Sequence, residues 1–294
     1  MRYAITDIGS NTVKISVYDV NERILHLFSH SITLGLDTYR SENELTEAGI
    51  IALANAITEH KNLAMAVACD RISCLATASL RSLANTDDVI ERVRRLTGLT
   101  IEIISGEREA ELAFAGLCSI VTHPADGILL DMGGASTEII TIRQQKPIAI
   151  SSLDFGALKL YHHYVSALIP NAKESLHIQC HVANELATHF AVSTTTSQTA
   201  YLTGGTAKAL CKLLCLNDPT KERSCFSVDE LYGLRDRLCD NGFLHKAASR
   251  IPERIHMIIP GTIAILEILR HFEIQRIEIV RSGIRDGYIF ERSQ

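Results

Sequence analysis

The sequence predicts a mixed α/β protein built from two similar halves. Short apolar segments with the period-two alternation of strands are interspersed with longer segments whose apolar residues recur every three to four positions, as in helices. The chain has 294 residues, enough for two domains with cores of their own. A short acidic, glycine-containing segment also occurs twice, 124 positions apart, at residues 7–12 and 131–138.

In the first half, three strands precede the first helix, and helices and strands then alternate. The predicted strands are residues 4–7, 13–18, 24–33, 71–76 and 99–104. Thr46 is placed to cap a long amphipathic helix. A second helix starts at residues 85–88 and ends at Gly98, a typical C-terminal signal. A third helix opens at residues 105–107 and runs to about Leu117.

The order then begins again after a polar break at residues 123–127, which predicts domains of residues 1–124 and 125–294. The predicted strands are residues 127–131, 135–143, 147–151, 200–203 and 277–280. Asp154 is expected to cap a helix through Tyr164, and Ser227 with Glu230 forms a capping box. Further helices are predicted at 172–190, from 206, at 260–272 and after 283. A βββαβαβα unit used twice is the arrangement of the actin, Hsp70 and sugar-kinase (ribonuclease H-like) superfamily, which implies an interdomain cleft.

Composition excludes several classes of function. A net charge of −5 with dispersed basic residues argues against a nucleic-acid-binding protein, which needs clustered cations. No apolar stretch approaches the roughly 20 residues that span a bilayer, and the N-terminus lacks a signal-peptide pattern, so we expect a cytoplasmic protein without membrane contact. Eight cysteines without a C-x-x-C pair are expected to be free thiols.

The repeated acidic segment is suited to holding phosphate. Glycines allow backbone N–H groups to converge on one anion, hydroxyl side chains add donors, and a leading aspartate can hold a metal that neutralises phosphate. An ordinary hairpin turn uses the same residue types, so either segment alone is more often a simple turn than a phosphate-binding loop. Because both segments have the same order of residue types in corresponding places, we predict two loops that grip one phosphorylated ligand.

Seven segments, in order along nearly the whole chain, resemble the exopolyphosphatase and guanosine pentaphosphatase (Ppx/GppA) family. They are residues 7–12 (DIGSNT), 76–81 (ATASLR), 104–110 (ISGEREA), 130–138 (LDMGGASTE), 152–157 (SLDFGA), 204–209 (GGTAKA) and 282–287 (SGIRDG). The chain is similar to short members without a C-terminal HD-type domain. The resemblance implies hydrolysis of terminal phosphoanhydride bonds in inorganic polyphosphate or in guanosine pentaphosphate (pppGpp), with Mg²⁺ or another divalent cation.

The resemblance also implies residue roles. Glu109 corresponds to the catalytic glutamate that orients or deprotonates water, while Asp131 and Glu138 correspond to a second acidic pair that is catalytic and holds metal, with Asp7 as a further metal ligand. The implied phosphate-binding residues are Gly9, Ser10, Asn11, Arg81, Gly133, Gly134, Ser136 and Thr137. Gly204, Gly205 and Lys208 are implied as a nucleotide or anion site. Each has a plainer alternative: helix-dipole stabilisation for Glu109, solvent exposure for Glu138 and Arg81, and a strand-to-helix turn for Gly204 and Gly205.

Three residues depart from the family pattern: Ala135 replaces a third glycine, Glu111 replaces an arginine, and His256 replaces an aspartate. A polyphosphate- or nucleotide-binding sensor with little or no turnover is therefore the main alternative, and a sugar or acetate kinase a weaker one. The residues do not choose between polyphosphate and pppGpp, although net acidity favours short or metal-masked substrates. The residues do not indicate an oligomeric state, and a homodimer is only the default because it is the commonest oligomer.

Overall fold

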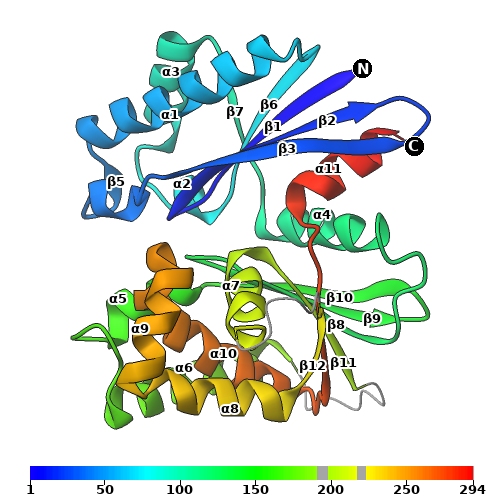
Figure 1. Ribbon diagram of the computed structural model, residues 1–294. Helices are drawn as coiled ribbons and strands as arrows, with labels where there is room; N and C mark the ends of the chain where they lie inside the picture. Colours follow the sequence, from blue (N-terminus) through cyan, green and yellow to red (C-terminus); the bar gives the residue numbers. More distant parts are fainter. Residues whose placement is uncertain (191–197, 217–222, 294) are drawn as a thin grey trace. The chain divides into compact units, whose positions relative to one another are not determined.

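The computed structural model describes residues 1–190, 198–216 and 223–293 (Figure 1). The chain divides into two compact units. The first contains residues 1–119 and 284–294, and the second contains residues 120–283. Each unit is built on one main β-sheet, so the predicted α/β class with two domains is confirmed.

The sheet of the first unit has the order β3-β2-β1-β6-β7. Its strands are β1 (Arg2–Ile8), β2 (Thr12–Val20), β3 (Ile24–Thr33), β6 (Arg71–Ala76) and β7 (Ile101–Ile103). The first three pair antiparallel, and β6 and β7 run parallel to β1. Short elements complete the unit: a 3₁₀ turn (Leu36–Tyr39), β4 (Arg40–Ser41), β5 (Glu44–Leu45) and α2 (Ala78–Arg81).

Helices cover both faces of this sheet (Figure 1). Helices α1 (Glu47–Ala66) and α3 (Thr86–Thr97) pack on the face to which Ala4 and Ile15 point. Helices α4 (Gly106–Cys118) and α11 (Ile284–Ser293) pack on the face to which Ile5 and Tyr18 point. Because side chains alternate along a strand, Asp7 and Lys14 also belong to the α4 and α11 face.

The sheet of the second unit has the order β10-β9-β8-β11-β13-β12. Its strands are β8 (Gly127–Met132), β9 (Thr137–Arg143), β10 (Lys146–Leu153), β11 (Thr199–Thr203), β12 (Cys225–Ser227) and β13 (Arg276–Ile279). Its helices are α5 (Ala157–Tyr164), α6 (Ala172–His189), α7 (Gly204–Leu214), α8 (Val228–Leu238), α9 (Asn241–Arg250) and α10 (Ile255–His271), with a 3₁₀ turn at Pro252–Arg254. Helix α10 is buried from Met257 to Leu269 and forms the centre of the core.

Several helix ends follow from local sequence as predicted. The Thr46 side chain accepts from Gly49 N–H at the start of α1, and Ser227 forms its capping box with Glu230 at the start of α8. Gly98 ends α3 with a φ of 75°, in the left-handed region. The prediction for Asp154 was wrong, because Gly156 is the N-cap of α5 and Asp154 is exposed and pairs with Lys159 at 2.7 Å.

Two predicted boundaries in the second half also differ from the structure. Pro260 was expected to start a helix, yet it lies inside α10, which begins five residues earlier. The packing of an apolar face on the core therefore outweighs the hydrogen bond that proline cannot make. Strand β12 and helix α9 were not predicted.

The C-terminal helix belongs to the first unit, whereas the predicted division placed residues 125–294 together. Helix α11 packs on α4 so closely that a Cβ at Gly287 would overlap the carbonyl of Leu112. Arg108 on α4 also pairs with Glu291 on α11. These contacts join residues far apart in sequence, which no local pattern reveals.

None of the helices in the described part of the chain is both long and apolar enough to cross a membrane. The eight cysteines are free thiols, as predicted.

Candidate active site

The first glycine loop connects β1 to β2. Its turn is closed by a hydrogen bond from Gly9 N–H to the Thr12 carbonyl at 3.1 Å. The Asn11 carbonyl accepts from the N–H groups of Leu34 and Gly35, both at 3.0 Å. Asn11 Nδ2 is buried and has no acceptor among the described residues. Since an unpaired buried donor is costly, this amide is a group that a bound acceptor would satisfy.

The second glycine loop connects β8 to β9 and has the same turn. Gly133 N–H donates to the Ser136 carbonyl at 3.0 Å. The carbonyls of Gly133 and Gly134 accept from the first three N–H groups of α5, at 2.9 to 3.0 Å. A Cβ at Gly156 would lie 2.5 Å from the carbonyl carbon of Gly134. Helix α5 therefore fixes the conformation of this loop.

Corresponding residues of the two hairpins differ by 124 in number, and the predicted likeness of the loops is confirmed by their shared backbone bond. Ser10 and Ser136 are each 5% exposed beside these turns. Asp7 faces Lys14 across the first hairpin, and Asp131 faces Glu138 across the second. The two hairpins thus have the same turn hydrogen bond, but the residues that face each other differ in charge.

The structure brings Asp131 and Glu138 together, because directly opposed residues of an antiparallel pair project from the same face. They are 7% and 1% exposed. Ser152 donates its hydroxyl proton to Glu138 Oε1 at 2.9 Å. Asp131 lies against Gly204, whose φ of 85° and contact with Asp131 Oδ1 both require glycine. The Asp131 carboxylate therefore lies at the N-terminus of α7, where the helix dipole favours negative charge.

Thr137 has a different role from the one predicted. Its side chain is fully buried, and Oγ1 donates to the Phe155 carbonyl at 2.6 Å. A hydroxyl has one proton, so Thr137 has none left to give to a phosphate oxygen. It anchors β9 to the segment that leads into α5.

Asp7 is held by an arginine that the sequence analysis did not single out. Arg285 on α11 donates from Nη1 to Asp7 Oδ2 at 2.7 Å and from Nε to Ser16 Oγ at 3.0 Å. The two charged side chains are 12% and 20% exposed. The charge of Asp7 is therefore already balanced by a fixed cation, which is at odds with its predicted role as a metal ligand. Arg285 lies in the SGIRDG segment, whose resemblance to the family was the one sequence feature that could have pointed to it.

Glu109 lies in the first turn of α4, whose N-cap Ser105 accepts from Arg108 N–H. It is 6% exposed, and its Oε2 lies 3.4 Å from Arg81 Nη1. The same Nη1 donates to the Ile104 carbonyl at 2.9 Å. Arg81, predicted to bind phosphate, thus contacts the predicted catalytic carboxylate. Its guanidinium carries three further N–H donors, on Nε and Nη2.

The start of α7 carries the residues of the predicted anion site, and Arg254, which the sequence analysis did not single out, reaches it from the 3₁₀ turn at Pro252–Arg254. Gly205 packs against the guanidinium of Arg254, where a Cβ would overlap it. No ion pair to Arg254 is present among the described residues, and burial lowers its pKa. The Thr206 hydroxyl, also buried, has no partner among them. Lys208 lies four residues after Gly204 and is half-buried. An unpaired guanidinium beside a helix N-terminus is suited to binding an anion.

The model of the Ppx/GppA phosphatase family matches residues 17–294, nearly the whole chain. The chain belongs to this family. It is 26% identical to Exopolyphosphatase 1 of Mycobacterium bovis over 99% of this chain and 88% of that protein. It is 25% identical to the guanosine-5'-triphosphate,3'-diphosphate pyrophosphatase of Pseudoalteromonas atlantica, over 98% of this chain but only 58% of that protein.

Solved structures show the same fold. The Ppx/GppA enzyme of Aquifex aeolicus has a TM-score of 0.78 at 23% identity, covering 99% of both chains. An exopolyphosphatase from Cytophaga hutchinsonii has a TM-score of 0.87 at 19% identity, covering 100% of this chain and 98% of that one. At these identities the likeness concerns the fold, and it agrees with the α/β class predicted from sequence.

The acidic pair of the second unit fits the requirements of a magnesium ion. No group of three or more His, Cys, Asp or Glu side chains in the described ranges has the arrangement of a metal site. Magnesium commonly uses only one or two carboxylates, with waters and substrate phosphates completing its shell. Asp131 and Glu138 would supply two such carboxylates from one face of the hairpin, whereas Asp7 is paired with Arg285.

The three departures from the family pattern have simple local environments. Ala135 does not adopt a positive φ, so its position does not require glycine. Glu111 accepts a hydrogen bond from Arg108 Nη1 at 2.9 Å, so the negative charge of Glu111 is balanced by Arg108. His256 packs edge-on against Tyr161, and burial lowers its pKa, with His162 and Arg254 adding to the effect.

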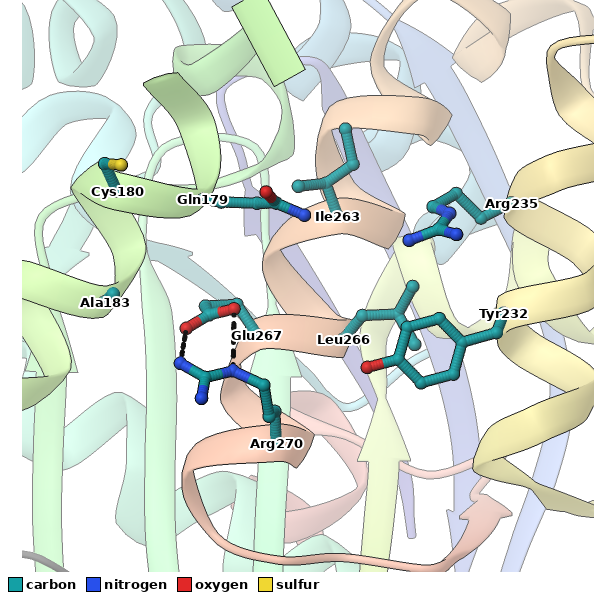
Figure 2. A pocket seen from close by; sticks show the side chains of 9 residues that line it. All are labelled: Gln179, Cys180, Ala183, Tyr232, Arg235, Ile263, Leu266, Glu267 and Arg270. Carbon is teal, nitrogen blue, oxygen red and sulfur yellow. Dashed lines mark hydrogen bonds and ion pairs between the residues drawn. The ribbon is translucent and has the colours of Figure 1, made fainter. Parts of the chain in front are cut away.

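A groove of about 390 Å³ lies elsewhere in the second unit, between α6, α8 and α10 (Figure 2). Ile263 and Leu266 line it, and the ion pair of Glu267 with Arg270 lies beside them. It contains none of the predicted site residues. The groove is therefore separate from the candidate site residues of the second unit, which lie at its glycine loop and at the start of α7.

Proposed function

We propose that this protein hydrolyses terminal phosphoanhydride bonds of inorganic polyphosphate, of pppGpp or of both, and releases orthophosphate. The observation that supports this most directly is the buried carboxylate of Glu109 beside Arg81, in a member of a phosphatase family. Relatives named exopolyphosphatase and guanosine pentaphosphate pyrophosphatase support the substrate class.

In this proposal Glu109 orients the attacking water and accepts its proton. Its position on the first turn of a capped helix limits its motion, and a positioned base contributes about 10²- to 10⁴-fold to a rate. Arg81 holds the Glu109 carboxylate through Nη1 and offers its other N–H groups to a phosphoryl oxygen. Phosphoryl transfer requires mainly positioning and charge stabilisation, which these two residues supply.

The remaining residues bind the phosphates. In each unit the glycine loop offers to phosphate oxygens those backbone N–H groups that do not close its turn, and the first loop adds the Asn11 amide. Arg254 and the start of α7 bind a further anionic group. A divalent cation, Mg²⁺ in our proposal, would be held by Asp131 and Glu138 and would neutralise phosphate charge when bound.

The test is a phosphate-release assay with long-chain polyphosphate, tripolyphosphate, pppGpp and ATP, each with and without Mg²⁺. We expect Mg²⁺-dependent orthophosphate release from at least one of the first three substrates and much less from ATP. Release of no phosphate from any of them would contradict the proposal. The same panel decides between polyphosphate and pppGpp, a choice that the residues leave open.

One observation favours a second function, a polyphosphate or nucleotide sensor without turnover. Glu109 is only 6% exposed and already contacts Arg81, so access of water to its carboxylate is restricted. Isothermal titration separates the two functions. Tight binding without phosphate release over hours would favour the sensor, whereas turnover rejects it. The predicted cytoplasmic location and homodimer are part of the proposal and stay predictions.

A further inference from the structure

The third strand of each unit lies at an edge of its sheet. In the first unit this strand is β3 (Figure 1), and in the second it is β10. Among the described residues, the opposite edges of the two main sheets are β7 and β12, which have three residues each. An edge strand presents unpaired backbone N–H and C=O groups to other chains, and proteins protect such edges with short strands, charged residues, proline or bulges.

Strand β10 has this protection, whereas β3 has little of it. Lys146 and Pro147 open β10, and its register shifts between Pro147 and Ala149. The ten residues of β3 include no Lys, Arg, Asp, Glu or Pro. Its Leu25 and Leu27 side chains are 56% and 39% exposed. A long, uncharged and partly apolar edge of this kind is suited to pairing with another strand.

The backbone of β3 shows which groups are available for such pairing. Its register with β2 is regular over residues 28–33 and shifts just before them. At the next position, Leu34 N–H donates to the Asn11 carbonyl at 3.0 Å. Residues that bond to the neighbouring strand alternate with residues that do not, so every second residue of 28–33 points its N–H and C=O away from β2. These residues, all with exposed side chains, are Ser29, Ser31 and Thr33.

A second copy of the same strand fits these groups. In an antiparallel pair centred on Ser31, each Ser31 faces the other, and Ser29 of one copy faces Thr33 of the other. Every outward-facing N–H then meets an outward-facing carbonyl. The regular stretch ends at Leu27, where the register shifts, and at Gly35, whose φ is 60°. Leu27 of one copy would lie opposite Gly35 of the other, so the pairing ends at the same place in both.

We propose that β3 pairs with β3 of a second copy of this chain, so that two first units share one continuous sheet about a two-fold axis at Ser31. The strand has no formal charge at neutral pH, so pairing places no like charges opposite each other, although each chain has a net charge of −5. A two-fold contact uses the same surface of both copies, so the assembly closes as a dimer. The inference goes beyond the proposed function and does not depend on hydrolysis.

Sedimentation equilibrium of the full chain over a range of concentrations tests the dimer. We expect the wild type to show a monomer–dimer equilibrium. Ser31→Lys should raise the Kd of the dimer at least about tenfold, because two lysines would then face each other across the axis. Ser31→Thr is the matched control, since it adds no charge and suits a strand, and it should dimerise as the wild type does. Circular dichroism checks that both variants are folded.

A second control places the same charge on the other long edge strand. Ile148 on β10 is 52% exposed, and Ile148→Lys should leave the Kd of the dimer unchanged. A wild-type chain that is monomeric at every concentration would overturn the proposal and leave the β3 edge to a strand of another protein. A dimer that survives Ser31→Lys, or one that Ile148→Lys weakens equally, would overturn it as well.

Amide hydrogen exchange followed by nuclear magnetic resonance tests the pairing without any substitution, and it decides if Ser31→Lys is not folded. The N–H groups of Phe28, His30 and Ile32 bond to β2 and should be protected at all concentrations. Those of the outward-facing residues should be protected only where the dimer forms and should exchange rapidly on dilution. Equal exchange of the outward-facing groups at high and low concentration would overturn the proposal. Because neither experiment measures phosphate release, the dimer and the proposed function can fail separately.

Discussion

The Glu109 carboxylate is buried beside Arg81, and its replacement by an amide tests the chemistry at the scale of one residue. We expect Glu109→Gln to lower kcat about 10²- to 10⁴-fold, because an amide cannot accept the proton of water. Tripolyphosphate affinity should change little. Glu107→Gln, on the same helical turn but exposed, is the control and should keep its activity. Wild-type kcat in Glu109→Gln would remove Glu109 from the mechanism.

His60 makes the stability of the first unit depend on pH. It is 1% exposed under the sheet, near Thr6, and burial lowers its pKa to about 4, with His30 adding to the effect. In the unfolded chain its pKa is about 6.5, so the unfolded state binds more protons between pH 6.5 and 4. The free energy of unfolding is therefore unaffected by this group above pH 6.5, and protonation of His60 in the unfolded state lowers it by up to about 3 kcal/mol as the pH falls to 4.

Denaturant unfolding at a series of pH values measures this loss. His60→Gln should flatten the curve between pH 6.5 and 4, since an amide does not titrate there. His245→Gln, which replaces an exposed histidine of the second unit, controls for the loss of a histidine as such. An equal slope in His60→Gln and the wild type would contradict the assignment.

The sequence predicts which candidate residues contact each other where the partners are near in the chain, and it does not where they are distant. Asp131 and Glu138 face each other because they belong to one hairpin, which period-two alternation already indicates. The partner of Asp7 is 278 positions away, on another helix, so no spacing rule connects it to Arg285. Thr137 was assigned to phosphate from its residue type, but its hydroxyl is used by the Phe155 carbonyl.

At the scale of elements, the α4 and α11 pair depends on one glycine. A Cβ at Gly287 would overlap the Leu112 carbonyl oxygen and lie 2.9 Å from Gly116 N. We expect Gly287→Ala to destabilise the first unit by about 1–3 kcal/mol, because overpacking outweighs the higher helix propensity of alanine. Thermal or denaturant unfolding measures the change.

Gly233 on α8 supplies the matched comparison, because nothing lies within 4 Å of a Cβ built there. Gly233→Ala should stabilise the protein by about 0.5–1 kcal/mol through helix propensity alone. If Gly287→Ala were also stabilising, the close packing of α11 on α4 would be refuted.

The first residue of a helix was predictable where a side chain caps the helix, and less so where tertiary packing sets the position at which the helix begins. Thr46, Ser105 and Ser227 mark the starts of α1, α4 and α8 because their oxygens accept N–H groups within three residues. Helix α10 has no such cap and runs through Pro260 because its apolar side chains fill the core of the second unit. Local patterns contain no information about that environment.

At the scale of the whole molecule, the last helix in the sequence belongs to the first unit. Helix α11 buries Ile284, Tyr288 and Ile289 in the first unit's core, and Asp286 accepts from Tyr18 at 2.9 Å. The predicted boundary at residue 124 lies close to the observed one at 119 because a polar break marks it. The return of residues 284–294 was not predictable, since an amphipathic helix can pack on any apolar face.

A chain ending at Gly283 should therefore damage the first unit and spare the second. Without α11, the apolar face of β1 that carries Ile5 loses part of its cover, and Asp7 loses its guanidinium partner. We expect hydrogen exchange to show lost protection in β1, β2 and β6 but wild-type protection in β8, β11 and α10. Deleting only residues 292–294, whose described members are exposed, should leave both patterns unchanged. Protection that stays intact in β1, or that disappears equally from β8, would show that the C-terminal helix does not complete the first unit.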